Sequence, residues 1–289
     1  MDRKNILIIE KLLNTKIIYS KLLSDSFGIN CFKFTTSNNH SFIVKYYKKS
    51  KQDFNALEAE GKNLLYLKNL NLNFFPKVII NNSKYLIMSY LENNGIQPNL
   101  TNEDLLKVIT KLHSKYDIYY GYDFETQIGG LKQINKRSRN WVDFFRDFRL
   151  NYVFNLINIT KPMNTSTNVR IEYILKNLEN LIPKKPKASL LHGDLWEGNI
   201  LFHDKKLVVL IDPGSYFGHN ELEIAYLRWF NPKFIDKNFL TKYNNNIKIN
   251  ESYLEYEPIY QLYYSMLNVL LWDRNYIFDV ERLLNKIKV

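Results

Sequence analysis

Residues 189–216 read SLLHGDLWEGNILFHDKKLVVLIDPGSY, and this stretch decides the fold that we expect. A carboxylate, Asp194, is followed after four intervening residues by a carboxamide, Asn199. A hairpin pattern comes next, and its second apolar run, residues 207–211, ends at another carboxylate, Asp212. Asp and Asn are also common turn residues. A polar turn alone, however, does not explain why a second Asp closes the following strand.

This spacing matches the catalytic loop of protein kinases. In that loop, an Asp accepts the proton of the attacking hydroxyl, and an Asn after the same gap binds metal together with a later Asp. Divalent cations neutralise the charge that develops on a triphosphate, and Mg²⁺ prefers oxygen ligands from carboxylate and carboxamide groups. The stretch therefore favours phosphoryl transfer from ATP.

The composition is that of a globular chain large enough for two lobes. The chain has 289 residues, of which 45% are hydrophobic and 15% aromatic, and these values exclude a disordered protein. The formal net charge of +11 would suit a nucleic-acid partner, but lysines are spread along the whole chain among many Asn, Ile and Tyr residues. Such a mixture is typical of A/T-rich codon usage. We therefore expect no nucleic-acid partner.

The single cysteine, Cys31, excludes an intramolecular disulfide and a cysteine-cluster zinc site. We expect a reducing, cytoplasmic location, and we expect Cys31 to act as a small buried hydrophobe and not as a redox handle. Charged residues interrupt the apolar run near the N-terminus, and no apolar stretch approaches the roughly 18 residues of a membrane span. We therefore expect neither a signal peptide nor a membrane partner.

Residues 1–92 show the pattern of a small antiparallel sheet with helices. Apolar periodicity and turn residues predict helices over residues 2–13 and 53–70, and strands over residues 16–22, 29–36, 41–47, 75–80 and 85–91. A polar, glycine-containing segment follows the last strand and is the expected hinge. We predict an N-terminal ATP-binding lobe of residues 1–92 and a C-terminal lobe of residues 93–289.

Helical patterns predominate beyond the hinge. Predicted helices cover residues 101–113, 140–157, 168–181, 221–230, 236–243, 253–271 and 277–287. Residues 119–135 form a long irregular loop, and loops of this length in a compact domain tend to be functional. The patterns together predict an α+β, bilobal, protein-kinase-like fold with a small antiparallel-sheet lobe and a larger, mainly helical lobe.

Lys45 lies in the β-forming run FIVKYY, residues 42–47, where a kinase-like lobe carries its phosphate-binding lysine. Glu58, in the early turns of the next helix, is expected to pair with this ammonium group. A lone Lys and a lone Glu are usually solvated surface charges, and only their order along the chain favours the pair. Gly28, just before the second strand, either covers phosphates with backbone N–H groups or belongs to an ordinary hairpin turn.

The chain also resembles the fructosamine kinase family, a branch of the kinase-like fold near the aminoglycoside phosphotransferases. The matching segments are HGDLWEGN at residues 192–199, IDPGSYFGHNELEIA at 211–225, IGGLKQIN at 128–135, WVDFFRDFRL at 141–150 and YQLYYSMLN at 260–268. The likeness covers nearly the whole C-terminal lobe, whereas few residues of the N-terminal lobe match. The chain departs from the family in having Phe27-Gly28 where a Gly-Gly pair is usual, and in residues 126–127 and 131–134.

The resemblance implies transfer of the γ-phosphate of ATP to a hydroxyl of a ketosamine, the amine-linked ketose that glycation produces. Asp194 would orient and deprotonate the hydroxyl, Asn199 and Asp212 would hold Mg²⁺, and Lys45, supported by Glu58, would bind the phosphates. Phosphorylation makes the adduct labile, so the resemblance implies a role in deglycation. The acceptor would be either a small-molecule ketosamine or a glycated protein.

Further contacts with the nucleotide are expected in the N-terminal lobe. Gly28 would approach the phosphates. Tyr90 and Glu92, at the hinge, would lie near the adenine, whose edge would bond to backbone groups.

Further contacts with the substrate are expected in the C-terminal lobe. Trp196 would stack on the sugar or on its amine-bearing arm, or alternatively anchors the loop in the core. His219 and Glu221 would reach the substrate or brace the second metal loop. Gln133 and Asn135 belong to the loop that is expected to face the substrate.

Three other functions compete with a ketosamine kinase. An aminoglycoside or other metabolite phosphotransferase would keep Asp194, Asn199 and Asp212 but not the remaining family segments together. A catalytically inactive, kinase-like binding protein would have lost one of these side chains, and none is lost. A nucleic-acid-binding module would show binding that falls steeply with salt, which the diffuse charge pattern does not favour.

Overall fold

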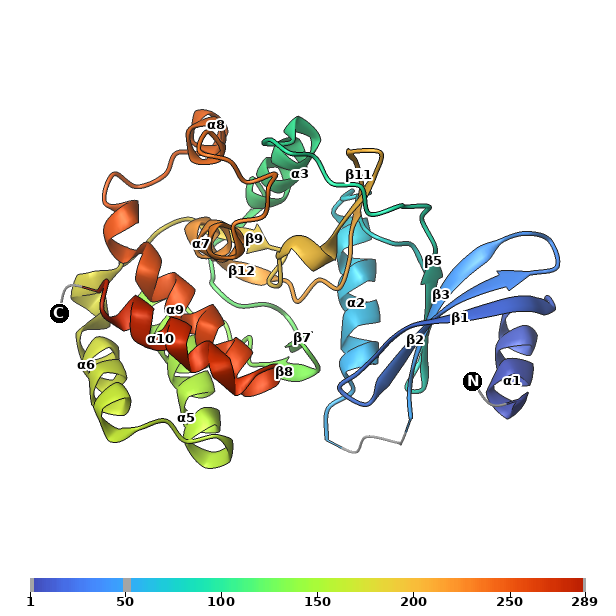
Figure 1. The fold of residues 1–289 in the computed structure, drawn as a ribbon, viewed down its shortest axis with the longest axis horizontal. Coiled ribbons are helices and arrows are strands. Elements are labelled where there is room, and N and C mark those ends of the chain that lie inside the picture. Colours follow the sequence, from blue (N-terminus) through green and yellow to red (C-terminus); the bar gives the residue numbers. More distant parts are fainter. Residues whose placement is uncertain (1–2, 49–52, 288–289) are drawn as a thin grey trace.

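The computed structural model describes residues 3–48 and 53–287 and has the α+β architecture expected from the sequence. Its N-terminal part is built on a five-stranded antiparallel sheet with the order β1-β2-β3-β5-β4. The elements are α1 (Arg3–Leu13), β1 (Ile17–Ser26), β2 (Ile29–Thr36), β3 (Ser41–Tyr47), α2 (Ala56–Asn69), β4 (Val78–Asn81) and β5 (Tyr85–Ser89). The sheet forms one end of the molecule, with α1 on its outer side and α2 toward the remaining chain (Figure 1).

Strand alternation decides which face of this sheet Lys45 occupies. Successive side chains of a strand point to opposite faces. Val44 and Tyr46 of β3 join one apolar cluster with Phe32 of β2 and Ile9 of α1. Lys45, between them, therefore points to the inner face, where it is 9% exposed.

The C-terminal part is mainly helical. Its helices are α3 (Glu103–His113), α4 (Trp141–Phe145), α5 (Asn151–Thr160), α6 (Thr165–Leu181), α7 (Asn220–Phe230), α8 (Phe239–Asn246), α9 (Tyr253–Leu271) and α10 (Ile277–Leu284), with a π-helical turn η1 (Arg146–Leu150) and 3₁₀ turns η2 (Glu197–Asn199) and η3 (Arg274–Tyr276). Helix α9 packs against α5, α7 and α10. It is apolar around most of its circumference, which suits a helix at the centre of a domain.

Short strands hold the loops that the sequence singled out. In one small sheet, β9 (Ala188–Leu191) lies between β12 (Tyr216–His219) and β6 (Tyr116–Asp117). The hairpin of β10 (Ile200–His203) and β11 (Lys206–Leu210) connects the two loops, and β7 (Thr126–Ile128) pairs with β8 (Leu131–Gln133). The chain therefore runs from β9 through the first loop, along the hairpin and back through the second loop to β12.

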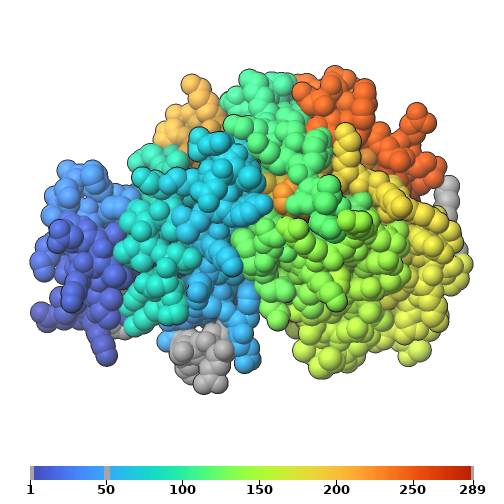
Figure 2. Space-filling view, turned by 180° about the vertical axis from the view of Figure 1, so that it is seen from behind, coloured from blue at the N-terminus to red at the C-terminus, as the bar shows by residue number. Residues whose placement is uncertain are grey.

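The two parts share one apolar core. Leu57 and Leu64 of α2 belong to the same buried cluster as Tyr122 and Leu190 of the C-terminal part. In Figure 2 the light-blue residues around α2 lie against the green residues of the C-terminal part, and α2 packs on β7. A boundary at residue 92 stays a prediction, since residues 90–102 form neither helix nor strand.

Most predicted elements are confirmed, and several of them differ in their bounds or continuity. The predicted strand over 75–80 begins at Val78, after Pro76, which has no N–H for the ladder. The helix predicted over 236–243 begins at Phe239 because the Asp236 carboxylate accepts bonds from Thr101 and from the Asn238 N–H. The helix predicted over 140–157 is interrupted by η1. Within the described ranges, no helix is long and apolar enough to cross a bilayer.

Candidate active site

Two loops meet at the end of the β12-β9-β6 sheet, and a glycine allows them to touch. Gly193 has φ +87, and a Cβ built there would overlap the carbonyl oxygen of Gly214. Only glycine tolerates both the left-handed backbone and this close approach. Asp194, in the first loop, is therefore held against the loop that carries Asp212.

Asp194 is held by its own loop and by α7. The Asn199 Nδ2 donates to the Asp194 Oδ2 at 3.0 Å and to its main-chain oxygen at 2.8 Å. The Tyr226 hydroxyl lies 3.4 Å from Oδ1. Burial, and after it the negative charge of Asp212, raises the pKa of Asp194 to about 7. A carboxylate with this pKa is poised to accept a proton near neutral pH.

Lys45 joins the two parts of the molecule through carboxylates. Its Nζ lies 2.7 Å from Glu60 Oε1 of α2 and 2.6 Å from Asp212 Oδ1 of the second loop. Burial alone would lower the pKa of Lys45, but the charges of Asp212 and Glu60 outweigh it and raise this pKa. Lys45 is therefore charged.

The predicted pairing of Lys45 with Glu58 is wrong. Glu58 lies in the first turn of α2 and is exposed, and its backbone N–H donates to the cap residue Asn55. Residues two apart on a helix point in nearly opposite directions. Glu60 therefore faces the sheet when Glu58 faces solvent.

Glu223 of α7 braces the first loop, although from the sequence we singled out Glu221 and not Glu223. Its carboxylate is fully buried and accepts from the N–H groups of His192 at 3.0 Å and Gly193 at 2.7 Å. His113 of α3 lies 2.9 Å from the same carboxylate. Burial alone would raise the pKa of Glu223, but the bonds and charge of His113 and the other partners lower it. His192, whose pKa burial lowers, bonds to the Ile211 carbonyl and so ties the first loop to the second.

Asn199 and Asp212 suit a magnesium ion by the chemistry of their oxygens. Both line a cavity of about 190 Å³ together with Asp194 and Lys45. The Asn199 Nδ2 is used on Asp194, and no described residue donates to its Oδ1. A carboxamide oxygen and two carboxylates are a hard-oxygen donor set. Among the described residues, His, Cys, Asp and Glu form no metal-binding group of three or more.

A second cavity, of about 570 Å³, lies between the N-terminal sheet and the β10–β11 hairpin. Lys45, Asp212 and Tyr90 are among its lining residues, and the Lys33 Nζ lies 3.7 Å from the centre of the Tyr90 ring. Glu92 is exposed, and neither Glu92 nor Gly28 lines this cavity. Of the three hinge and turn residues that we expected at a nucleotide, the structure brings only Tyr90 to the cavity.

Gly28 belongs to the tight turn between β1 and β2. It has φ +75, and a Cβ at this position would meet open space. Its neighbour Phe27 instead reaches the C-terminal part, where its ring packs on Gly129 and Gly130 and lies 5.0 Å from the Trp272 ring. The tip of the first hairpin thereby touches the loop after α9.

A third cavity, of about 380 Å³, adjoins Asp194 and has aromatic walls. Its walls include Trp196, Tyr226, Phe230 and Trp272. The Trp196 ring lies 5.6 Å from that of Phe230, and it folds over Gly198, where a Cβ would overlap it. Trp196 therefore both packs on α7 and presents a face to the cavity.

Four residues expected at the substrate lie behind the site instead. The Gln133 Nε2 donates to the Gly214 carbonyl at 2.9 Å, and the Asn135 Oδ1 accepts from Arg149 at 2.7 Å. His219 bonds to Tyr260, and Glu221 accepts from the Asn250 N–H. All four are buried, and none lines the cavities that contain Asp194. Hydrogen bonds from these side chains hold the loops, which is the bracing role that we also expected of His219 and Glu221, and contact of the four residues with substrate stays a prediction.

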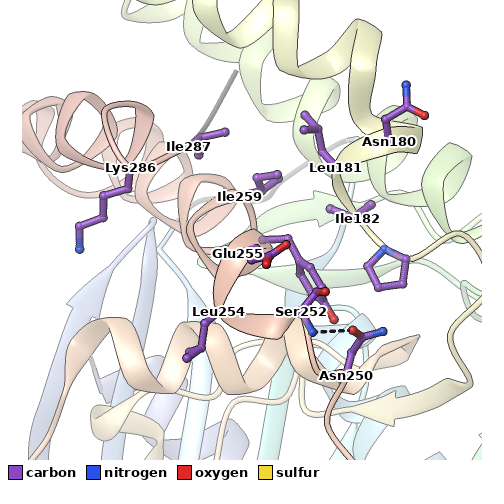
Figure 3. A pocket seen from close by; sticks show the side chains of 12 residues that line it. Asn180, Leu181, Ile182, Asn250, Ser252, Leu254, Glu255, Ile259, Lys286 and Ile287 are labelled. Atoms are coloured by element: carbon purple, nitrogen blue, oxygen red, sulfur yellow. Dashed lines mark hydrogen bonds between the residues drawn. The ribbon is translucent and has the colours of Figure 1, made fainter.

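A larger cavity, of about 640 Å³, lies elsewhere, where the ends of α6, α9 and α10 meet (Figure 3). Ile182, Asn250, Glu255 and Lys286 are among its lining residues. None of the residues that we predicted for the site belongs to it. Convergent charged groups, and not volume, therefore mark the candidate site.

Comparison with known proteins gives the family. The sequence profile described as fructosamine kinase matches residues 23–289, which is most of the chain. The chain belongs to the fructosamine kinase family. A relative in Enterococcus faecium named "probable ketoamine kinase" is 30% identical over 208 residues, with 69% of this chain and 70% of the relative covered. The corresponding "probable ketoamine kinase" of Vibrio cholerae is 26% identical and covers 85% of each chain.

Solved structures show the fold of this family member. The crystal structure of a "putative fructosamine-3-kinase" from Thermobifida fusca superposes with a TM-score of 0.85 at 20% identity, with 97% of each chain covered. The gentamicin complex of APH(2")-IIa superposes with a TM-score of 0.66 at 19% identity, covering 100% of this chain and 97% of the other. The family member therefore has the kinase-like fold that its sequence predicted.

Proposed function

We propose that this chain transfers the γ-phosphate of ATP to a sugar hydroxyl of a ketosamine. One observation carries the proposal: Asp194 lines both the small cavity of Lys45, Asn199 and Asp212 and the aromatic cavity beside it. A phosphate donor in the first cavity and a hydroxyl in the second would meet at this carboxylate. Family membership and the names of the relatives, among them "Ketosamine-3-kinase" of mouse, support a ketosamine as acceptor.

The residues of the chain divide the chemistry between them. Asp194, with its raised pKa, accepts the hydroxyl proton as the new phosphate ester bond forms and ADP leaves. Lys45, oriented by Glu60, binds phosphate oxygens. Asn199 and Asp212 would hold Mg²⁺, which neutralises charge on the phosphates when it is bound.

The cavity of about 570 Å³ between the N-terminal sheet and the β10–β11 hairpin would hold the nucleoside. Its inner surface is formed by apolar side chains from both parts of the molecule, including Ile43, Met88, Leu201 and Val209. Apolar walls above and below a slot suit a flat base, while polar backbone groups fix its edge. Tyr90 and Leu91 line the same slot.

The biological role follows from the acceptor. Phosphorylation of a ketosamine makes the adduct labile and frees the amine, so we propose a deglycation role in the cytoplasm. The single cysteine, Cys31, is compatible with a reducing compartment. Both free ketosamines and glycated proteins are candidate acceptors.

The test is Mg²⁺-dependent ATP consumption with ribulosyl-lysine, fructosyl-lysine, an aminoglycoside and choline as acceptors. We expect turnover of a ketosamine, and we expect Asp194→Asn to lower it by about 10²- to 10⁴-fold, the usual effect of losing a general base. ATP binding, measured by calorimetry, should be largely kept in this variant. Full activity of Asp194→Asn, or turnover of the aminoglycoside alone, would overturn the proposal.

A further inference from the structure

The aromatic cavity beside Asp194 is acidic although the chain is strongly basic. The chain carries 40 Lys and Arg residues against 29 Asp and Glu residues. The cavity nevertheless has two carboxylates, Asp194 and Asp273, among its lining residues and neither Lys nor Arg. A local charge of this sign, against the charge of the whole molecule, favours a cationic ligand.

Asp273 carries a carboxylate that has no cation beside it. It follows α9, where its N–H and that of Trp272 both donate to the Asn268 carbonyl. Its own carboxylate accepts from the Asn275 N–H at 2.9 Å and from the Asn275 Nδ2 at 3.3 Å. No Lys, Arg or His of the described ranges forms an ion pair with it. Asp273 therefore caps η3 and places its carboxylate at the cavity.

Trp272 adds the face of an aromatic ring next to this carboxylate. It lines the same cavity and is 55% exposed, and the Phe27 ring packs against it edge-to-face, with 5.0 Å between the ring centres. An indole face attracts cations through its quadrupole, and a neighbouring carboxylate strengthens the attraction. Trp272 and Asp273 thus combine two groups that recognise an ammonium ion.

We propose that Asp273, with the ring of Trp272, binds the protonated secondary amine of the ketosamine and so distinguishes ketosamines from sugars that lack the amine. The inference rests on the proposed function and deepens it. The amine of a ketosamine is bonded to the sugar itself, so it enters the cavity together with the hydroxyl that faces Asp194. In this arrangement Asp194 accepts the hydroxyl proton, and Asp273 binds the ammonium group elsewhere in the cavity.

The test compares two acceptors that differ in one atom: fructosyl-propylamine and the corresponding propyl ether, in which oxygen replaces the amine nitrogen. Asp273→Asn removes the charge, but its side-chain oxygen still caps η3, so the fold is kept. Asp104→Asn is the matched control, because Asp104 is an exposed carboxylate in the first turn of α3 and lies outside the cavity. Kinetics of phosphorylation and calorimetric binding are measured for all three proteins.

We expect Asp273→Asn to raise the KM for the amine by about two- to fivefold, as for the loss of an ion pair at an exposed site, with kcat unchanged. The KM for the ether should not change, and Asp104→Asn should behave as wild type. Equal losses for amine and ether, or no loss at all, would overturn the inference and leave the proposed function standing.

A wild-type protein that turns over neither acceptor would contradict the proposed function separately. Calorimetry then decides the inference on its own. Tighter binding of the amine than of the ether, with the difference lost in Asp273→Asn, supports the ammonium site. The absence of any preference in the wild type would refute it.

Discussion

Lys45 connects the N-terminal sheet to the loop that carries Asp212. Its ammonium group lies between Glu60 of α2 and Asp212 of the second loop. A buried charge of this kind is tolerated because both partners are charged and close. Burial raises the pKa of Glu60 to about 7, although the charge of Lys45 opposes this shift.

Glu60→Gln and Glu58→Gln form a matched pair of substitutions on one helix. We expect Glu60→Gln to lower kcat/KM for ATP by about 10- to 100-fold, since a charge-assisted bond to Lys45 contributes roughly 1.5–3 kcal/mol. Glu58→Gln should stay within about twofold of wild type, because an exposed carboxylate contributes little. Steady-state kinetics at varied ATP measure both. Similar losses in the two variants would refute the assignment of Glu60.

Gly193 and Gly28 both have positive φ but differ in their surroundings. Gly193→Ala places a methyl group on the Gly214 carbonyl, whereas Gly28→Ala meets open space. We expect Gly28→Ala to cost about 1–2 kcal/mol of unfolding free energy, the strain of a left-handed alanine. Gly193→Ala should cost clearly more and should displace Asp194, with loss of activity. Urea unfolding of both variants checks the order, and a smaller loss for Gly193→Ala would contradict the close approach of the two loops.

At the scale of elements, the start of α7 is tied to α9 by a chain of polar groups. The Trp141 Nε1–H donates to the Tyr260 hydroxyl, which is 2.8 Å from His219 Nδ1. Because indole can only donate, the Tyr260 proton is free to point at His219. The His219 Nε2 then faces Glu221 at 3.4 Å. These residues fix α7, which in turn presents Glu223 to the catalytic loop.

This arrangement predicts a pH dependence of stability. Burial lowers the pKa of His219 from 6.5 to about 3, so between these values the unfolded chain binds a proton that the folded chain excludes. The free energy of unfolding therefore falls as pH drops below 6.5, and the contribution is fully kept above that value. Between about pH 7.5 and about pH 5, the loss should be roughly 2 kcal/mol smaller in His219→Gln, which does not titrate. Urea unfolding at the two pH values measures the loss of unfolding free energy in both proteins. Identical losses in wild type and His219→Gln would show that folding does not lower the pKa of His219.

At the scale of the whole molecule, the site exists only where the two parts meet. Lys45 and Glu60 come from one part, and Asp194, Asn199 and Asp212 come from the other. Phe27 crosses from the tip of the β1–β2 hairpin to Trp272, beside the cavity that carries Asp273. That cavity has two carboxylates and neither Lys nor Arg among its lining residues, so its charge is opposite to that of the chain.

The sequence by itself determined the fold class, the loops and the charged side chains that they carry. Strand β3 and helix α9 have the predicted bounds, and Asp194, Asn199, Asp212 and Lys45 line one cavity as expected. These features depend on local rules, namely apolar periodicity and the spacing of residues within one loop or strand. Such rules act between neighbours in the chain, so they can be followed along it.

Only the tertiary structure decided which of several similar residues faces the site. The phase of α2 selected Glu60 over Glu58, and the packing of α7 on the first loop selected Glu223 over Glu221. The side chains of Gln133 and Asn135 bond to protein groups and hold loops in place. Asp273 lies just after the C-terminal end of α9 and lines the cavity of Asp194. The physical reason is that a helix turns by about 100° per residue. A shift of two positions reverses the direction of a side chain, and only packing against distant elements sets that direction.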